Sequence, residues 1–448
     1  MKLHPLETTM RRPILLLAHV LAVLALAACG GSSSGATTTP NTASPPVATN
    51  GGGSGGSNDL DKQDLPHVVL VSLDGFRWDY QDRFATPGMD RLAATGIRAA
   101  SLQPVFPTVT FPNHYSIATG LNPSSHGIVA NSFPSRDRQR WYSLGDPAAV
   151  GDGTWYGGEP AWVAVEAAGM VAATYFFVGS EAAIGGIRPT YWEPFDGSVP
   201  GDVRVDRVLE WLNMPDDTRP HFIAVYFGDA DSVGHQFGPD SVEIAVTVAE
   251  LDRLLIRLLD GIDQSPVSGE VTVILVADHG MSTYQPGSEV LVLSDVLDLS
   301  AMSVVGGGAY AFLFQEQPDL ARAVQVRDAI NAVWQHGHAW LRDEAPAAWQ
   351  VTPESRFPDI IVQADAGFRV VESPGQLAQL PVGLHGWAPG FTDMQGIIVA
   401  AGPRLPRGVA IDSVSVLDVY PLVLEILDIP LVAPIDGDPQ ALAGLLQD

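Results

Sequence analysis

The amino-acid sequence predicts an α/β sandwich in which helices cover both faces of a largely parallel central sheet. Three apolar runs, which begin at His67, His221 and Val271, have the length and composition of strands, and an acidic residue follows each of them. Continuous apolar runs are typical of parallel strands that are buried on both faces. Segments with helical periodicity alternate with the apolar runs, and this alternation favours a parallel sheet.

The predicted elements alternate along the chain from residue 67 onward. The predicted strands cover 67–73, 172–178, 221–227, 271–277, 309–314, 360–364 and 396–401. The predicted helices cover 87–96, 110–120, a stretch ending at 169, 203–212, 241–263, 320–334 and 416–427. The sequence contains no internal repeat and no second linker, so a single domain is expected over 65–448.

The first 64 residues are expected to lie outside this domain. Residues 1–28 look like a lipoprotein-type signal peptide, because Arg11 and Arg12 precede a short apolar run that ends in Leu-Ala-Ala-Cys29. The alternative is an ordinary signal peptide followed by a chance cysteine. Residues 29–64 are rich in Gly, Ser, Thr and Pro and predict a flexible tether. We therefore expect an exported lipoprotein, anchored through Cys29 to a bacterial membrane and facing the periplasm or the cell exterior.

The charge of the chain restricts its partners. The 448 residues carry a net charge of -27, which argues against binding to a nucleic-acid duplex. Lys2 and Lys62 are the only lysines. A bound phosphate must therefore be neutralised by arginine, by backbone dipoles or by metal ions.

Carboxylates and imidazoles recur where the predicted strands end. Asp74 ends the first strand, Asp231 and His235 follow the 221–227 strand, and Asp278 and His279 follow the 271–277 strand; His385 lies in a glycine-flanked loop. Ligands of open α/β sheets bind at the carboxyl ends of the strands. Any one pair alone is better explained by a salt bridge or a core histidine, and Asp74 alone could equally cap the next element. Together they provide the nitrogen and oxygen ligands that two zinc ions require.

Thr110 is the candidate nucleophile. It lies where a loop containing Pro107 is expected to enter the 110–120 helix, so free amides and the positive end of the helix dipole would surround its hydroxyl. The alternative is a helix N-cap. Two cations close together could clamp the attacking and leaving oxygens of a displacement at phosphorus, and would make threonine a better nucleophile.

Five motifs together resemble the nucleotide pyrophosphatase/phosphodiesterase family of the alkaline phosphatase superfamily. They are Asp74-Gly-Phe-Arg, Thr110-Phe-Pro-Asn-His-Tyr, Asp231-Ser-Val-Gly-His235, Ala277-Asp-His-Gly-Met and His385-Gly-Trp. The resemblance implies an alkaline-phosphatase-like sandwich and a covalent threonine intermediate. It also implies two Zn²⁺ ions per chain. One would be held by Asp74, Thr110, Asp278 and His279, and the other by Asp231, His235 and His385.

The same resemblance implies a set of substrate-binding residues. Asn131 would donate to a phosphate oxygen together with the Thr110 amide, although it could also be a simple turn residue. The aromatic residues that would form a nucleobase slot, with core packing as the alternative for the last three, are Phe111, Phe195, Phe177, Tyr226 and Tyr191. His114 and His126 also match the family but are interpreted as structural. Residues 132–154 contain no lysine, whereas nucleotide-hydrolysing animal relatives use lysines there.

The function predicted from the sequence is hydrolysis of nucleotide phosphodiester or pyrophosphate bonds to a nucleoside 5'-monophosphate. The first alternative is a phosphodiesterase that acts on lipid headgroups or other non-nucleotide diesters. The second is a surface-anchored binding protein that has kept the fold and lost turnover. Retention of the threonine and of every implied metal ligand argues against the second alternative.

Overall fold

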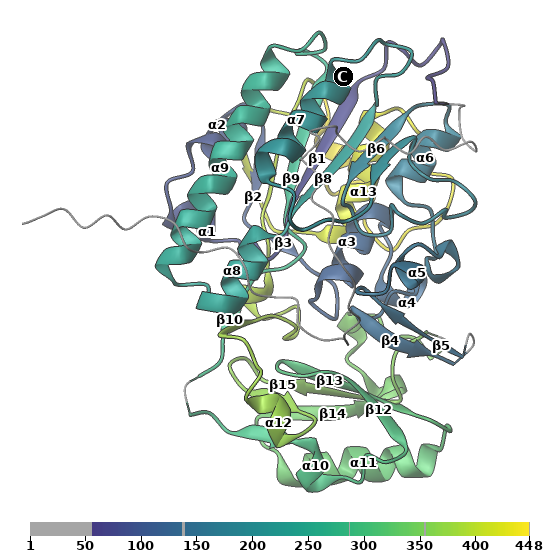
Figure 1. The fold of residues 1–448 in the computed structure, drawn as a ribbon, viewed down its shortest axis with the longest axis vertical. Helices are drawn as coiled ribbons and strands as arrows, with labels where there is room; N and C mark the ends of the chain where they lie inside the picture. The colour runs from purple at the N-terminus through teal and green to yellow at the C-terminus, as the bar shows by residue number, and fades with distance from the viewer. Residues whose placement is uncertain (1–55, 137–138, 286, 354, 448) are drawn as a thin grey trace, which may run out of the picture. The chain divides into compact units, whose positions relative to one another are not determined.

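A computed structural model of the chain describes residues 56–136, 139–285, 287–353 and 355–447 (Figure 1). The predicted signal peptide over 1–28, the predicted lipidation site Cys29 and most of the predicted tether lie outside the described residues. The described residues belong to one compact unit. None of the helices within them is both long and apolar enough to cross a bilayer.

An eight-stranded sheet forms the centre of this unit, in the order β19-β2-β18-β9-β1-β8-β6-β7. The strands β9, β1, β8, β6 and β7 run parallel to one another. Strand β18 runs antiparallel to both of its neighbours, β9 and β2. The strands are β1 (His67–Leu73), β2 (Ile97–Ala99), β6 (Ala172–Tyr175), β7 (Tyr191–Glu193), β8 (Phe222–Phe227), β9 (Val271–Val276), β18 (Ile398–Ala401) and β19 (Val409–Ile411). The predicted α/β sandwich with a largely parallel sheet is confirmed.

Side chains of β1 alternate between two apolar cores, one on each face of the sheet. Val68 and Leu70 belong to one core, and Val69 and Val71 belong to the other. Helices α3 (Thr110–Thr119), α6 (Ala161–Ala167) and α13 (Val419–Ile426) contribute to the first core; α2 (Pro87–Thr95), α7 (Gly201–Leu212) and α9 (Val242–Asp263) contribute to the second (Figure 1). Burial on both faces explains why the strand sequences are apolar throughout.

A second sheet, which the sequence analysis did not predict, lies outside the central one. It is antiparallel, in the order β12-β13-β15-β14, and α11 packs on it. Its elements are β12 (Met302–Gly306), β13 (Tyr310–Gln315), β14 (Gly337–Leu341), β15 (Ile360–Ala364) and α11 (Leu320–Val333). The predicted strands over 309–314 and 360–364 exist, but placing them in the alternation of the central sheet was wrong. An apolar run identifies a buried strand without identifying its partner.

Several short elements complete the fold. They include the short helices and strands α1 (Tyr80–Arg83), α5 (Pro147–Val150), α10 (Leu293–Val296), α12 (Pro374–Leu377), β3 (Leu102–Gln103), β11 (Val290–Val292), β16 (Arg369–Val371) and β20 (Val414–Ser415). The 3-10 helices are η1 (Gly153–Trp155), η2 (Arg342–Glu344), η3 (Ala347–Trp349), η4 (Thr392–Met394), η5 (Val416–Asp418) and η6 (Ala443–Leu445).

The folded part of the chain begins before residue 65. Asn58 is buried, its side-chain amide donates to the carbonyls of Asp216 and Arg219, and its side-chain oxygen accepts from the amide of Val171. Asn58 falls within the segment assigned to the tether. Its three hydrogen bonds place the end of any tether upstream of this residue.

Candidate active site

Three neighbouring parallel strands bring the predicted acidic residues to one edge of the sheet. In the order β9-β1-β8, Asp278 follows β9, Asp74 follows β1, and Asp231 lies in α8 (Asp229–Phe237), directly after β8. Gly75 has a positive φ of 67°, and a Cβ at this position would lie 2.8 Å from the Asp231 Cα. Glycine after Asp74 therefore allows the two acidic segments to approach each other.

His385 reaches this edge through a small antiparallel ladder. It follows β17 (Gly383–Leu384), which pairs with β10 (Ser282–Thr283), just downstream of His279. A Cβ on Gly383 would lie 2.2 Å from the Gly234 carbonyl oxygen in α8. The glycines in the His235 and His385 motifs thus permit close packing of the two segments that carry the histidines.

Thr110 is the first residue of α3, and its side chain is half-buried. The N-cap position is occupied by Val109 in extended conformation, so the alternative of Thr110 as an N-cap does not hold. The Thr110 Oγ1 lies 3.4 Å from His279 Nε2. The Thr110 amide, as the first of the helix, has no partner within the helix.

The six predicted carboxylate and imidazole ligands meet in overlapping clusters. Asp231, His235 and His385 form one group whose ligand atoms lie within 4.8 Å of one another. Asp74 belongs to two further groups, one with His114 and Asp278 and one with Asp231 and His279. Asp231 links the clusters, because its carboxylate belongs both to the group of His235 and His385 and to the group of Asp74 and His279.

Backbone carbonyls orient the three imidazoles. The Nδ1 atoms of His235, His279 and His385 donate to the carbonyl oxygens of Gly383, Gly280 and Thr108 at 2.8, 2.9 and 2.9 Å. A histidine that donates through Nδ1 keeps a lone pair on Nε2, which is the usual arrangement in metal sites. The Nε2 atoms of His235 and His385 face each other at 3.2 Å, and a cation would satisfy both lone pairs.

Each of the three carboxylates has one buried oxygen that makes no hydrogen bond within the part of the chain that the structure describes. Asp74 Oδ1, Asp231 Oδ1 and Asp278 Oδ2 are buried oxygen atoms without a hydrogen bond among the described residues. Burial, followed by the charges of Asp278 and Asp231, raises the pKa of Asp74 well above its usual range. Burial and the neighbouring His279 and His235 lower the pKa of His385 well below its usual range, so its imidazole is neutral at pH 7. This donor set fits a pair of divalent cations.

His114 is a further residue at the site that sequence reasoning had set aside as structural. Its Nε2 is 2.9 Å from the Ser72 hydroxyl, and its Nδ1 lies 3.0 Å from the Thr110 carbonyl and 3.1 Å from Asp278 Oδ2. Because both of its nitrogens already have protein partners, we interpret His114 as positioning Asp278. His126 is also buried between protein partners, and burial lowers its pKa to about 3.

A cavity of about 510 Å³ opens in front of Thr110. Phe111, Asn131, Phe177, Phe195 and Tyr226 line it, as the sequence analysis expected. Phe195 is 57% exposed and can adjust to a ligand, whereas Phe177 is buried. Tyr226 also donates to Asp74 Oδ2 at 2.7 Å and therefore helps to orient that carboxylate.

Tyr191 does not line this cavity. It lies in β7, and its ring stacks on Trp211 in the core that α7 and α9 share. Phe176 lines the cavity instead; its φ of 68° ends β6 earlier than the predicted 172–178 strand. Sequence reasoning also missed Glu181, which lines the cavity and accepts from the Phe195 amide at 3.1 Å.

Asn131 approaches the start of α3. Its Oδ1 accepts from the Phe111 amide at 2.9 Å, so its NH₂ group is the remaining donor. Pro112 has no amide hydrogen, and the Phe111 amide is engaged. The Asn131 NH₂ group and the Thr110 amide are thus the two donors available near the threonine hydroxyl.

A protein-family model matches most of the chain. The model of the type I phosphodiesterase / nucleotide pyrophosphatase family matches residues 68–388, which include all seven predicted ligands. The chain belongs to this family. Its alkaline-phosphatase-like sandwich is therefore the fold that the sequence predicted.

Family relatives align over most of the described chain. Ectonucleotide pyrophosphatase/phosphodiesterase family member 1 of Homo sapiens is 31% identical over 394 residues, which are 86% of this chain and 42% of the relative. An uncharacterized pyrophosphatase/phosphodiesterase of Schizosaccharomyces pombe is 32% identical over 383 residues, 81% of this chain and 77% of the relative. The chain spans less than half the length of the human relative.

Solved structures of the family share the fold. Murine ectonucleotide pyrophosphatase/phosphodiesterase 5 superimposes with a TM-score of 0.79 at 26% identity, covering 85% of this chain and 100% of that chain. An inactive threonine-to-alanine variant of the same murine protein, in complex with AMP, matches equally well.

Proposed function

We propose that this family member is a two-zinc phosphodiesterase that hydrolyses nucleotide phosphodiester or pyrophosphate bonds to a nucleoside 5'-monophosphate. The observation that carries the proposal is the convergence of the half-buried Thr110 hydroxyl with six carboxylate and imidazole ligands beside one cavity. The inactive threonine variant of the murine relative supports a nucleophilic role for threonine.

The reaction divides into two displacements at phosphorus. The Thr110 oxygen attacks the phosphorus, its bond to phosphorus forms, and the bond to the leaving-group oxygen breaks; water then cleaves the phosphothreonine and releases the monophosphate. Divalent cations held by the aspartates and histidines of the two ligand sets would acidify the threonine hydroxyl and neutralise the leaving oxygen. The Asn131 NH₂ and the Thr110 amide are placed to donate to a non-bridging oxygen as charge develops on it.

The cavity favours diesters over triphosphates. None of the described residues that line it is lysine or arginine, and Glu181 adds a carboxylate. A long anionic leaving group would gain no cationic partner from these side chains. Phe111 and Phe195 provide aromatic faces on which a base can stack. We therefore expect nucleoside diesters and dinucleotides to be better substrates than ATP.

A matched pair of chromogenic substrates tests the proposal. We expect the enzyme to cleave the nitrophenyl ester of a nucleoside monophosphate faster than methyl nitrophenyl phosphate, and both far faster than the nitrophenyl monoester. Phe111→Ala should weaken kcat/KM for the nucleoside ester by about 10-fold, because base stacking contributes 1–3 kcal/mol, and should spare the methyl ester.

Two outcomes would contradict this assignment. Equal loss on both esters in Phe111→Ala would show that Phe111 has no base-specific role. Preference for a glycerophosphodiester over the nucleoside ester would support the alternative of a diesterase for lipid headgroups.

We further propose that the protein is exported and anchored to a membrane through Cys29. The short apolar leader and the Leu-Ala-Ala-Cys29 sequence support this proposal, and a cysteine that carries lipid would join a membrane anchor to the soluble domain through residues upstream of Asn58. We expect Cys29→Ala to move the protein from the membrane fraction to the soluble fraction with unchanged specific activity. Fractionation that stays unchanged would refute the lipid anchor.

A further inference from the structure

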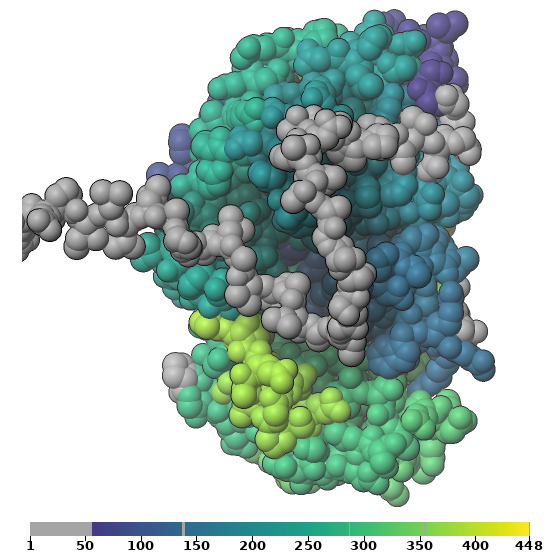
Figure 2. Space-filling view, viewed as in Figure 1, coloured from purple at the N-terminus to yellow at the C-terminus, as the bar shows by residue number. Residues whose placement is uncertain are grey.

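A second cavity, of about 560 Å³, lies between the β4–β5 hairpin and the second sheet. Strands β4 (Ser132–Ser135) and β5 (Arg140–Ser143) directly follow Asn131 in the chain. Figure 2 shows the blue segment that contains this hairpin immediately above the green segment that contains β12–β15. This cavity shares no lining residue with the catalytic cavity. Its volume falls within the range of roughly 300–1,000 Å³ that is typical of small-molecule sites.

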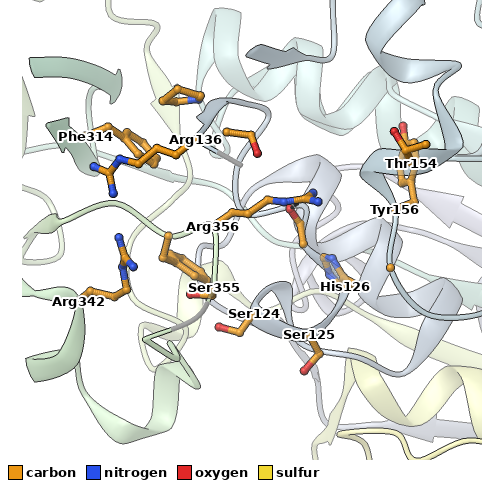
Figure 3. A pocket seen from close by; sticks show the side chains of 15 residues that line it. Ser124, Ser125, His126, Arg136, Thr154, Tyr156, Phe314, Arg342, Ser355 and Arg356 are labelled. Carbon is orange, nitrogen blue, oxygen red and sulfur yellow. Dashed lines mark hydrogen bonds between the residues drawn. The ribbon is translucent and has the colours of Figure 1, made fainter. Parts of the chain in front are cut away.

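Three arginines line this cavity, namely Arg136, Arg342 and Arg356. None of its described lining residues is Asp or Glu. The chain has a net charge of -27 and only 24 lysines and arginines, so a cluster of three guanidiniums is unusual here. Figure 3 shows Arg136 and Arg342 at one end of the cavity and Arg356 extending toward His126.

Two of the guanidiniums share one carboxylate. Arg136 and Arg342 both pair with Asp359, and Arg136 also donates to the Gln315 carbonyl at 3.0 Å. One shared carboxylate therefore faces two guanidiniums. Burial and the nearby Arg136 lower the pKa of Arg342, although the carboxylates of Asp359 and Asp343 oppose this shift. An anion in the cavity would relieve the repulsion between the two guanidiniums.

Backbone carbonyls hold the other arginine groups in place. Arg342 donates to the carbonyls of Pro353 and Pro358 at 2.8 and 3.0 Å. Arg356 donates to the carbonyls of Trp155 and Gly127 at 2.7 and 3.2 Å. Such fixed guanidiniums lose little side-chain entropy when they bind an oxyanion, and their planar fork matches a phosphate group.

Serine hydroxyls complete the set of donors. Ser124 and Ser125, in α4 (Pro123–His126), line the same cavity. Ser355 lines it as well, but its hydroxyl donates to the Thr352 carbonyl at 2.6 Å. Ser124 Oγ accepts from the Thr352 amide at 3.2 Å and therefore keeps its own hydrogen for a ligand. Guanidiniums combined with hydroxyls are a donor set for a dianionic phosphoryl group rather than for a carboxamide or an apolar ligand.

We propose that this arginine cavity is a second anion site, separate from the catalytic centre, which binds a dianionic phosphoryl group, either free phosphate or a phosphate monoester. The proposal does not rest on the reaction proposed above, because it concerns binding by Arg136, Arg342 and Arg356 alone. Its ligand class includes the monophosphate products of phosphodiester cleavage.

Equilibrium dialysis of the metal-loaded protein with radiolabelled inorganic phosphate tests the site. We expect Arg136→Gln to bind one phosphate fewer per chain than the wild type, because loss of charge-assisted hydrogen bonds weakens that site by about 10- to 100-fold. The control is Arg98→Gln, which removes an arginine that pairs with Asp82 on the surface; it should bind as many phosphates as the wild type.

A second variant and a displacement experiment complete the test. If Arg136→Gln melts well below the wild type, Arg136→Lys keeps the charge without the fork and should weaken the same binding event without abolishing it. Displacement of the Arg136-dependent phosphate by a nucleoside monophosphate would assign the site to phosphate monoesters, and retention of the label would assign it to free phosphate. Equal phosphate binding by the wild type and Arg136→Gln would overturn the proposal. The arginines would then have only a structural role, as donors of hydrogen bonds to backbone carbonyls.

Discussion

Thr110→Ala is expected to lower turnover of a nucleoside diester by roughly 10³-fold or more, because removal of a nucleophile eliminates the covalent route. The hydroxyl is half-buried at the mouth of the catalytic cavity and lies 3.4 Å from His279 Nε2. Val109, not Thr110, occupies the N-cap of α3, so the substitution removes no cap. We therefore expect the melting temperature to change little.

Metal content and a conservative variant show whether Thr110→Ala removes the nucleophile or disturbs the metal site. Asp74, Asp278 and His279 remain in Thr110→Ala, so plasma mass spectrometry should find as much zinc per chain as in the wild type. Thr110→Ser keeps a hydroxyl and should retain most of the turnover. Acid quench of the wild type with a phosphorus-labelled diester should trap label on the chain. Residual activity within tenfold of the wild type in Thr110→Ala would reject the covalent mechanism.

The central sheet and its acidic edge could be predicted because their signals are local. Each parallel strand is a continuous apolar run, and Asp74 and Asp278 directly follow such runs. The motif around Thr110 contains its own helix start, and the helix ends at Gly120 as predicted, where the backbone is left-handed with a φ of 67°. Short-range sequence therefore determined which residues lie at the carboxyl edge.

Features that depend on tertiary partners could not be predicted in the same way. The strand over 360–364 is as apolar as a central strand, yet it pairs with β13 and β14 in the second sheet. Tyr191 and Phe195 are close in sequence, but the Tyr191 ring faces Trp211 and the Phe195 ring faces the cavity. Aromatic composition does not specify which side of the chain each ring occupies.

The arginine cavity is a second example of this limit. Arg136, Arg342 and Arg356 come from segments that no periodic pattern connects, and only the packing of the second sheet against the β4–β5 hairpin brings them together.

His114 is a residue whose general role could be predicted although its partner could not. The interpretation of His114 as structural agrees with its contacts, but its contact with Asp278 emerged only from the fold.

His385→Ala is expected to lower the bound metal from two ions per chain to about one and to reduce turnover severely. His385, Asp231 and His235 are the members of one ligand cluster, and loss of one ligand leaves two, which is fewer than catalytic zinc sites use. The His385 ring also stacks on His279 at 3.8 Å, so its removal opens space beside the other cluster. Asp74, Asp278 and His279 stay in place and should keep one ion bound.

The matched control for this loss is His338→Ala, because His338 is an exposed histidine of β14 and belongs to none of the three ligand clusters. Both variants lose one imidazole, so a drop in metal content confined to His385→Ala isolates the ligand role from any general effect of removing histidine. Zinc titration should then raise the melting temperature of His385→Ala less than that of His338→Ala, since an ion that binds only the folded state stabilises it by mass action. Two ions retained at wild-type affinity in His385→Ala would contradict the assignment and would require Asp231 and His235 to complete their site with a residue outside the cluster.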